Sequence, residues 1–127
     1  MKKTSLILIA AAALGASAAP ALAHHNGNAE FDMSKQFTVT GTLVELKDIN
    51  PHSKWLAVVK GPNGEAQNWE FSGVAATALR AKGVKVKEEI KPGDTYDFTY
   101  APAWTGSKTG ELVAITINGR KVQFVGE

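Results

Sequence analysis

Residues 37–47 read Phe-Thr-Val-Thr-Gly-Thr-Leu-Val-Glu-Leu-Lys, and this stretch carries the clearest strand pattern of the chain. Apolar residues first alternate with threonines, which is the pattern of a β-strand with one buried face. Gly41 then interrupts the alternation, and the apolar phase passes to Val44 and Leu46. A glycine inside a strand pattern indicates a bulge or a sharp bend. We therefore expect one long, bent strand here.

The rest of the chain predicts short strands around one helix. Ser72 is expected to N-cap the helix and Gly83 to end it, and Asn118-Gly119 is typical of a two-residue hairpin turn. Loops are expected at 48–52 and 101–110. The expected helix is 74–82, and the further strands are 55–60, 67–71, 95–100, 111–117 and 120–125.

This order of elements predicts an all-β domain with one helix, in which the helix lies between the third and fourth of five to six strands. Such a domain resembles the OB-fold, a small Greek-key β-barrel. The alternative is another small barrel or sandwich with one helix. In an OB-like barrel, the loops after the first and fourth strands commonly hold ligands. Here those loops carry His52 and Trp104.

The first 23 residues predict a secretory signal peptide. Lys2 and Lys3 precede an uncharged apolar stretch, and Ala21-Leu22-Ala23 is a small-x-small cleavage signal. A retained membrane anchor is the alternative, but the strongly apolar part is shorter than the roughly 20 residues that span a bilayer. We expect cleavage after Ala23 and a periplasmic or secreted protein with no membrane association. Residues 24–36 would then form an extended arm and 37–127 the barrel domain.

Cleavage changes the charge of the chain. The whole sequence of 127 residues has 14 basic and 12 acidic residues and a net charge of +2. Without Lys2 and Lys3, a mature chain of 104 residues has 12 of each, so its net charge is zero with neutral histidines. A neutral protein gains little from counterion release, and we expect no nucleic-acid partner. The sequence has no cysteine, which excludes disulfides, thiol nucleophiles and cysteine-ligated zinc.

The three histidines, His24, His25 and His52, are the candidate metal ligands. After cleavage, the α-amine and the ring of His24 could chelate one metal ion, and His52 or His25 could add another imidazole. Nitrogen donors in this arrangement suit copper(II) and resemble the histidine brace of secreted copper proteins. The alternative is that the two adjacent histidines lie on a flexible arm without a specific metal, and that His52 caps the Asn-Pro turn.

Met33, Trp55 and Trp104 are possible ligand contacts. Met33 is the one methionine of the mature chain, and one thioether falls short of a methionine-rich copper(I) site. Trp55 could instead belong to the core or its rim. Trp104 could stack on a ligand or pack over the mouth of the barrel. No Gly-x-Ser-x-Gly, His-Glu-x-x-His or phosphate-loop motif occurs, so we do not expect an enzyme.

Several segments resemble an uncharacterised family of small exported bacterial proteins. The resemblance rests on the following motifs: His24-His25, Ala29-Glu30-Phe31-Asp32, Thr40-Gly41-Thr42-Leu43, Asn50-Pro51-His52 with Trp55, Asn68-Trp69-Glu70-Phe71 and Lys91-Pro92-Gly93-Asp94. It implies export and a β-barrel, but no activity, because the family is a domain of unknown function. This chain departs from the family in having Asn26-Gly27 where Ser-Phe often follows the two histidines.

The sequence therefore predicts a small exported binding protein whose ligand is a copper ion or another small ligand. The alternatives are a metal-free envelope module that binds a saccharide, a peptide or a protein partner, and a structural envelope protein.

Overall fold

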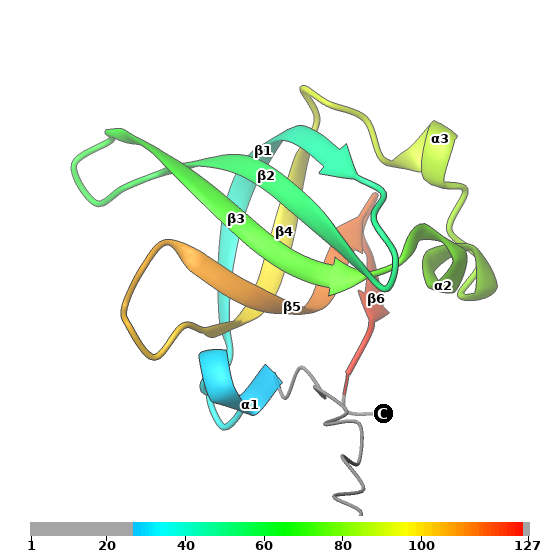
Figure 1. Cartoon of the computed structure of the whole chain (residues 1–127). Helices are drawn as coiled ribbons and strands as arrows, with labels where there is room; N and C mark the ends of the chain where they lie inside the picture. Colours follow the sequence, from blue (N-terminus) through cyan, green and yellow to red (C-terminus); the bar gives the residue numbers. More distant parts are fainter. Residues whose placement is uncertain (1–26, 126–127) are drawn as a thin grey trace, which may run out of the picture.

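The computed structural model of the protein describes residues 27–125. It contains a six-stranded sheet and three short helices (Figure 1). In chain order the elements are α1 (Gly27–Glu30), β1 (Phe37–Lys47), β2 (His52–Lys60), β3 (Ala66–Val74), α2 (Ala76–Ala81), α3 (Val86–Glu89), β4 (Thr95–Pro102), β5 (Thr109–Ile117) and β6 (Arg120–Gln123).

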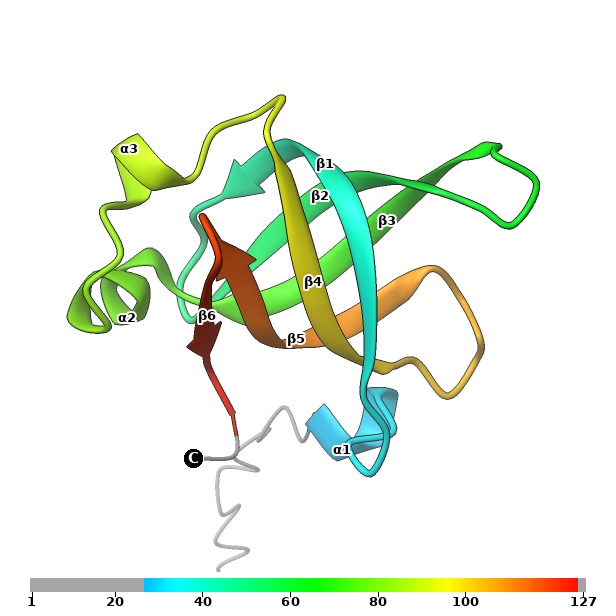
Figure 2. The same ribbon diagram turned by 180° about the vertical axis from the view of Figure 1, so that it is seen from behind.

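The sheet closes into a barrel. The order of hydrogen-bonded strands is β3-β2-β1-β4-β5-β6, and a further parallel pairing joins β3 to β5. This pairing closes a ring of five strands, and β6 extends from the outer edge of β5 (Figures 1 and 2). The predicted OB-like barrel, with a helix between the third and fourth strands, is confirmed.

The first strand has its predicted bounds, but its irregularity lies further along than Gly41. Gly41 and Thr42 pair with both β2 and β4, so β1 changes partners there. The β-bulge falls at Val44, between Leu43 and Glu45. Gly41 itself stays in register with both neighbours, and its surroundings are crowded, since a Cβ atom on it would lie 3.1 Å from Cγ2 of Val59.

Other boundaries differ from the prediction. His52 was expected in a loop, but it is the first residue of β2 and is in register with Val74. Ser72 belongs to β3, and Ala75 is the N-cap of α2 without a side-chain hydrogen bond. The pairing of β3 with β2 continues through Val74, so α2 begins only at Ala76. The expected hairpin turn is confirmed, since Asn118 and Gly119 have φ angles of 49° and 77°.

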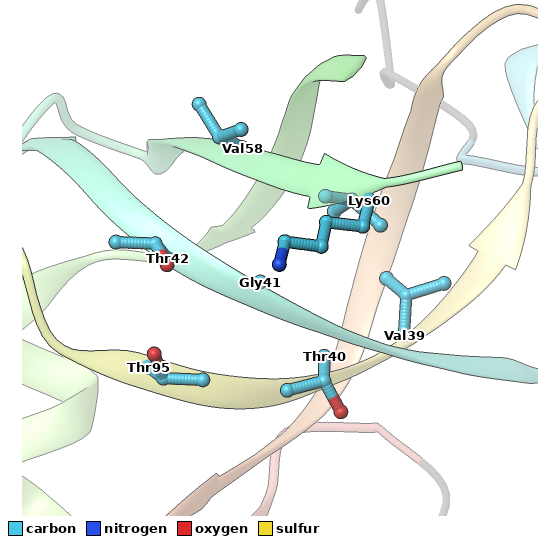
Figure 3. A pocket seen from close by; sticks show the side chains of 8 residues that line it. Val39, Thr40, Gly41, Thr42, Val58, Lys60 and Thr95 are labelled. Atoms are coloured by element: carbon cyan, nitrogen blue, oxygen red, sulfur yellow. The ribbon is translucent and has the colours of Figure 1, made fainter. Parts of the chain in front are cut away.

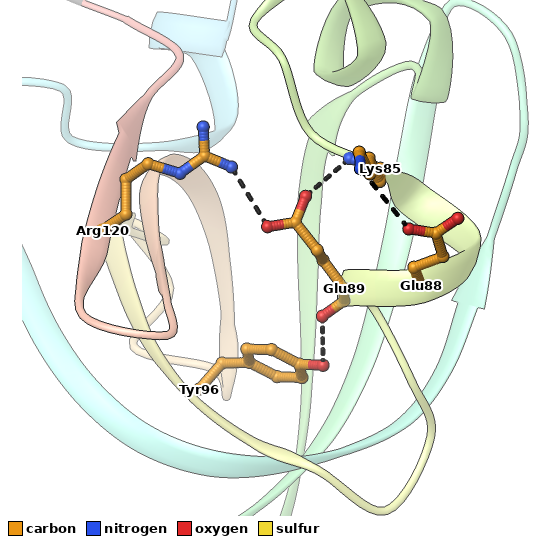
Figure 4. A network of polar contacts seen from close by, with 5 residues as sticks. All are labelled: Lys85, Glu88, Glu89, Tyr96 and Arg120. Carbon is orange, nitrogen blue, oxygen red and sulfur yellow. Dashed lines mark hydrogen bonds and ion pairs between the residues drawn. The ribbon is translucent and has the colours of Figure 1, made fainter.

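The region between α2 and β4 covers one end of the barrel (Figure 4). The hydroxyl of Tyr96 donates a hydrogen bond of 2.8 Å to the carbonyl of Glu89 and accepts one of 2.9 Å from the amide of Lys91. The Glu89 carboxylate lies 3.3 Å from Arg120 on β6. Beneath this region Leu79 is fully buried. The core between the two ends is made of Leu43, Trp55, Ala57, Phe71, Phe98, Leu112, Ile115 and Ile117.

Two polar side chains are buried in this core and satisfy each other. The indole Nε1 of Trp55 donates a hydrogen bond of 2.8 Å to Oγ of Ser53, and Ser53 donates one of 2.5 Å to the carbonyl of Val74. Both side chains have no exposed surface. The serine hydroxyl therefore links a buried donor to the end of β3.

Replacing Ser53 by Ala should lower the free energy of unfolding by about 1–3 kcal/mol, because the buried indole N–H then has no acceptor. Chemical denaturation of the two proteins measures this difference. Ser72→Ala is the matched control, since Ser72 is a partly exposed serine of the neighbouring strand. Equal losses of unfolding free energy in the two variants would show that the buried hydrogen bond does not stabilise the protein.

Candidate functional site

His52 lies exposed on the outer surface of the barrel, at the start of β2. Its side chain makes no hydrogen bond or ion pair with the residues at 27–125. Residues on the same face of a strand alternate, so Lys54 lies next to His52 on the outer face, about 6.7 Å further along the backbone. The outer face of β2 thus presents an imidazole that is free to bind a ligand.

The segment before β1 is anchored to the barrel and is not simply an extended arm. Phe31 is buried and forms an isolated bridge with Ala103. The amide of Asp32 donates a hydrogen bond of 2.8 Å to the carbonyl of Pro102, and the amide of Trp104 donates one of 3.1 Å to the carbonyl of Glu30. These contacts hold α1 against the end of β4 and the loop that follows it (Figure 1).

The carboxylate of Asp32 stabilises this anchored segment. It accepts hydrogen bonds of 2.5 Å from the hydroxyl and 3.2 Å from the amide of Ser34, and it lies 3.3 Å from Nζ of Lys35. The hydrogen bond from the Ser34 side chain is the largest cause that lowers the pKa of Asp32. The turn into β1 is therefore fixed by a local polar network.

A group of charged side chains lies beside α1, on the face to which His52 belongs. Lys54 is in register with Ser72 of β3, which is in register with Glu111 of β5. Directly opposed residues of neighbouring strands share a face. Nζ of Lys54 lies 2.7 Å from Oε1 of Glu70, and this ion pair, with a contribution from Glu30, raises the pKa of Lys54.

Glu111 is the residue of this group whose pKa is shifted most. Its burial, and then the negative charge of Glu30, raise its pKa from 4.5 to about 7. Glu111 was not predicted as a site residue, because in the sequence it is only the first residue of the expected strand 111–117. Its neighbour Glu30 could not be assigned, because only the docking of α1 brings the two carboxylates together.

The other predicted ligand contacts are dispersed. Trp104 lies in the loop between β4 and β5 and is 61% exposed. Met33 is partly buried in the anchored segment. Trp55 has no exposed surface and belongs to the core, so its ring offers nothing to a ligand at the barrel surface.

The predicted metal site is divided between described and undescribed parts of the chain. His24 and His25 lie outside residues 27–125, and His52 lies within them. Within the described range, no group of three His, Cys, Asp or Glu side chains could hold a metal ion. That range also contains no helix long and apolar enough to cross a membrane.

A shallow groove of about 530 Å³ lies where β1 and β2 diverge (Figure 3). Its walls carry the side chains of Thr40, Thr42 and Thr95 on one side and Lys60 on the other. The hydroxyl of Thr40 already donates a hydrogen bond of 2.6 Å to Asp97. The groove is open and contains none of the predicted site residues.

Glu111→Gln should change how stability depends on pH. The folded protein binds the Glu111 proton more tightly than the unfolded chain does. The contribution of Glu111 to the free energy of unfolding is therefore fully present below pH 4.5 and is lost as the pH rises through 7. We expect the wild type to lose roughly 1–2 kcal/mol more than the variant over this range, after allowing for solvent screening. Denaturation at several pH values measures this loss.

The exposed carboxylate Glu45, on β1, provides the control variant Glu45→Gln. The same slope in the wild type and in Glu111→Gln would contradict the assignment of this titration to Glu111.

Comparison with known proteins supports the fold and assigns the family. The mitochondrial single-stranded DNA binding protein Rim1 of S. cerevisiae has a similar crystal structure, with a TM-score of 0.51. The two are 10% identical, and the match covers 66% of this chain and 93% of Rim1. No curated protein shows significant similarity to the sequence. The model of a family of unknown function, DUF6152, matches residues 12–113, and the chain therefore belongs to this family.

Proposed function

We propose that this is an exported protein that binds a copper(II) ion through the N-terminus created by signal-peptide cleavage. The α-amine and ring of His24 would form a chelate, and His52 would supply a further imidazole, with His25 as an additional donor. The observation that carries this proposal is that Glu30 of the anchored α1 acts on Lys54, which lies two residues from the exposed His52 on β2.

The reach of the chain supports this arrangement. Glu30 is close enough to Lys54 and Glu111 to alter the pKa of each, so α1 lies near the outer faces of β2 and β5. His24 precedes Glu30 by six residues. Residues 27–30 are helical and rise about 1.5 Å each, and the three residues before them add at most about 11 Å, so the chain can reach about 15 Å from Glu30. His52 lies two residues from Lys54 on the same strand, so a shared site with His24 is within reach.

The donor chemistry also fits copper(II). Amine and imidazole nitrogens have reference pKa values of about 7.7–8.0 and 6.5, so both can be deprotonated near neutral pH at little cost. Copper(II) has the highest affinity of the divalent first-row metals for such donors and accepts tetragonal geometry. Glu30, Glu70 and Glu111 outnumber Lys54 in the neighbouring group, which favours a cation there.

The location in the periplasm or outside the cell is part of the same proposal. The free amine on His24 exists only if the chain is cut after Ala23. The N-terminal mass of protein recovered from the periplasm or medium of an expressing bacterium tests this cleavage directly.

The name of Rim1 raises single-stranded DNA as another ligand, whereas the sequence predicts no nucleic-acid partner. The outer surface of β2 and β3 carries the Lys54–Glu70 ion pair, in which the charge of the lysine is neutralised. Base stacking and phosphate neutralisation together sustain single-strand binding. We therefore favour the metal ion, and a titration with oligothymidylate at low salt tests the other ligand.

Copper(II) affinity should depend on the amine of His24. We compare the mature protein beginning at His24 with a form that carries one additional alanine before it, which retains all three imidazoles. The extension should weaken copper(II) binding at least about tenfold, because it removes the amine of the chelate. His52→Ala should weaken it in the native form and have less effect in the extended form. Competition titration and nitrogen hyperfine structure in electron paramagnetic resonance measure both effects.

Lys60→Ala is the matched control for His52→Ala, because Lys60 is another exposed outward residue of the same strand and lies outside the charged group. Equal copper(II) affinity of the native and extended forms would overturn the role of the His24 amine. An unchanged affinity in His52→Ala would remove His52 from the site.

A further inference from the structure

β1 begins and β4 ends at the end of the barrel away from α2 and α3 (Figures 1 and 2), and three aromatic side chains of β1, β3 and β4 lie in contact there. The ring of Tyr100 is the centre of this cluster, 6.2 Å from the ring of Phe37 and 5.2 Å from that of Trp69. Phe37 is 51% exposed and Trp69 is partly buried. We call these three residues the aromatic end.

Tyr100 has a hydroxyl group that the fold does not use. The residue is only 6% exposed, yet its hydroxyl makes no hydrogen bond to any residue at 27–125. In that part of the chain, no polar side-chain atom is completely buried without a partner, so this oxygen keeps some contact with solvent. Its partly exposed ring neighbours, Phe37 and Trp69, mark where that contact lies. Burial also raises the pKa of Tyr100.

The contrast with Tyr96 shows that this is unusual for the barrel. Tyr96 is equally buried at 5% exposure, and its hydroxyl both donates and accepts a hydrogen bond. A buried hydroxyl without a partner normally costs free energy. The free hydroxyl of Tyr100 is therefore available to a ligand at the aromatic end.

The polar groups beside these rings are an amide and a carboxylate, and the positive charge of Lys108 lies close enough to act on that carboxylate. Nε1 of Trp69 donates a hydrogen bond of 3.2 Å to Oε1 of Gln67. Nε2 of Gln67 donates one of 3.1 Å to Glu65, whose carboxylate also accepts a hydrogen bond from the amide of Asn63. Glu65 and Lys108 have opposite charges, so this group offers no net positive charge to a phosphate backbone. A neutral ligand could instead place an apolar face on the rings and its hydroxyl groups against the amide of Gln67 and the phenol of Tyr100.

We propose that the aromatic end binds a neutral saccharide, with a sugar ring stacked on Phe37 or Trp69 and a sugar hydroxyl bonded to the hydroxyl of Tyr100. Aromatic surfaces with a few placed polar groups are the usual composition of small-ligand sites. The C–H face of a pyranose packs on an aromatic ring, and its hydroxyls require neutral donors and acceptors. This site is separate from the proposed copper site and does not depend on it.

Three soluble trisaccharides test the proposal on the complete mature protein: cellotriose, maltotriose and N-acetylated chitotriose. Binding at millimolar concentration should change the fluorescence of Trp69 for at least one of them. Tyr100→Phe removes the hydroxyl alone and should weaken that binding about fivefold, which is the effect of one lost hydrogen bond. Phe37→Ala should weaken it about tenfold. Both variants should remain folded, because Tyr100 donates no side-chain hydrogen bond to residues 27–125 and Phe37 is half exposed.

Val44→Ala is the matched control for Phe37→Ala. Val44 lies on the same strand and has almost the same exposed fraction, 52%, but it is remote from the aromatic end. The Val44→Ala variant should bind the saccharide with the affinity of the wild type. Thermal melting of all variants separates loss of binding from loss of fold.

Failure of all three saccharides to bind would overturn the proposal, as would binding that Tyr100→Phe and Phe37→Ala leave intact. Binding of oligothymidylate, or self-association of the protein, that is lost in the same two variants would assign the aromatic end to another partner and would equally overturn it.

Discussion

The parallel contact between β3 and β5 is the constraint on which the rest of the structure depends. It joins Glu70–Ser72 to Thr109–Glu111 and converts a sheet with two open edges into a barrel. Gly110, the middle residue of the β5 segment in this contact, lies against the ring of Tyr100 on β4. A Cβ atom at this position would lie 2.5 Å from Cδ2 of Tyr100, closer than side-chain packing allows. The closed barrel therefore requires a glycine against this ring.

Closure of the barrel also determines the surroundings of both candidate sites. It places Glu111 in register with Ser72, and thereby on the face shared with Lys54. The end of β4 then offers Pro102 and Ala103 to the segment that contains α1. At the same end, the ring of Tyr100 is enclosed by Gly110 on one side and aromatic neighbours on the other, which leaves its hydroxyl at the boundary with solvent.

The sequence could predict the barrel because its signals are local. Alternation marks the strands, and Asn118-Gly119 marks a hairpin turn through backbone angles that glycine and asparagine adopt readily. The end of β3 could not be predicted, because pairing with β2 extends the strand through Ser72, a residue that locally suits a helix cap. The bulge at Val44 likewise depends on the register between β1 and β2.

The candidate site was predicted less completely than the fold. His52 and Trp104 are conspicuous in the sequence, since one follows Asn-Pro and the other lies among small polar residues. In the structure they occupy the start of β2 and the loop before β5, and both are exposed. Glu111 and Tyr100 gave no comparable signal. Their chemistry comes from neighbours that are distant in the sequence, namely Glu30 for Glu111 and Phe37 with Trp69 for Tyr100.

Glu30 and Glu111 form an arrangement that folding alone does not favour. Two carboxylates on docked elements repel each other once both are ionised, and partial burial increases the cost. Perturbed groups of this kind occur more often at functional sites than elsewhere, although structural networks produce them too. A cation held by the segment that precedes α1 would reduce the repulsion and favour the docked arrangement. The electrostatic cost of docking α1 and the proposed affinity for copper(II) would then be two consequences of the same negative face.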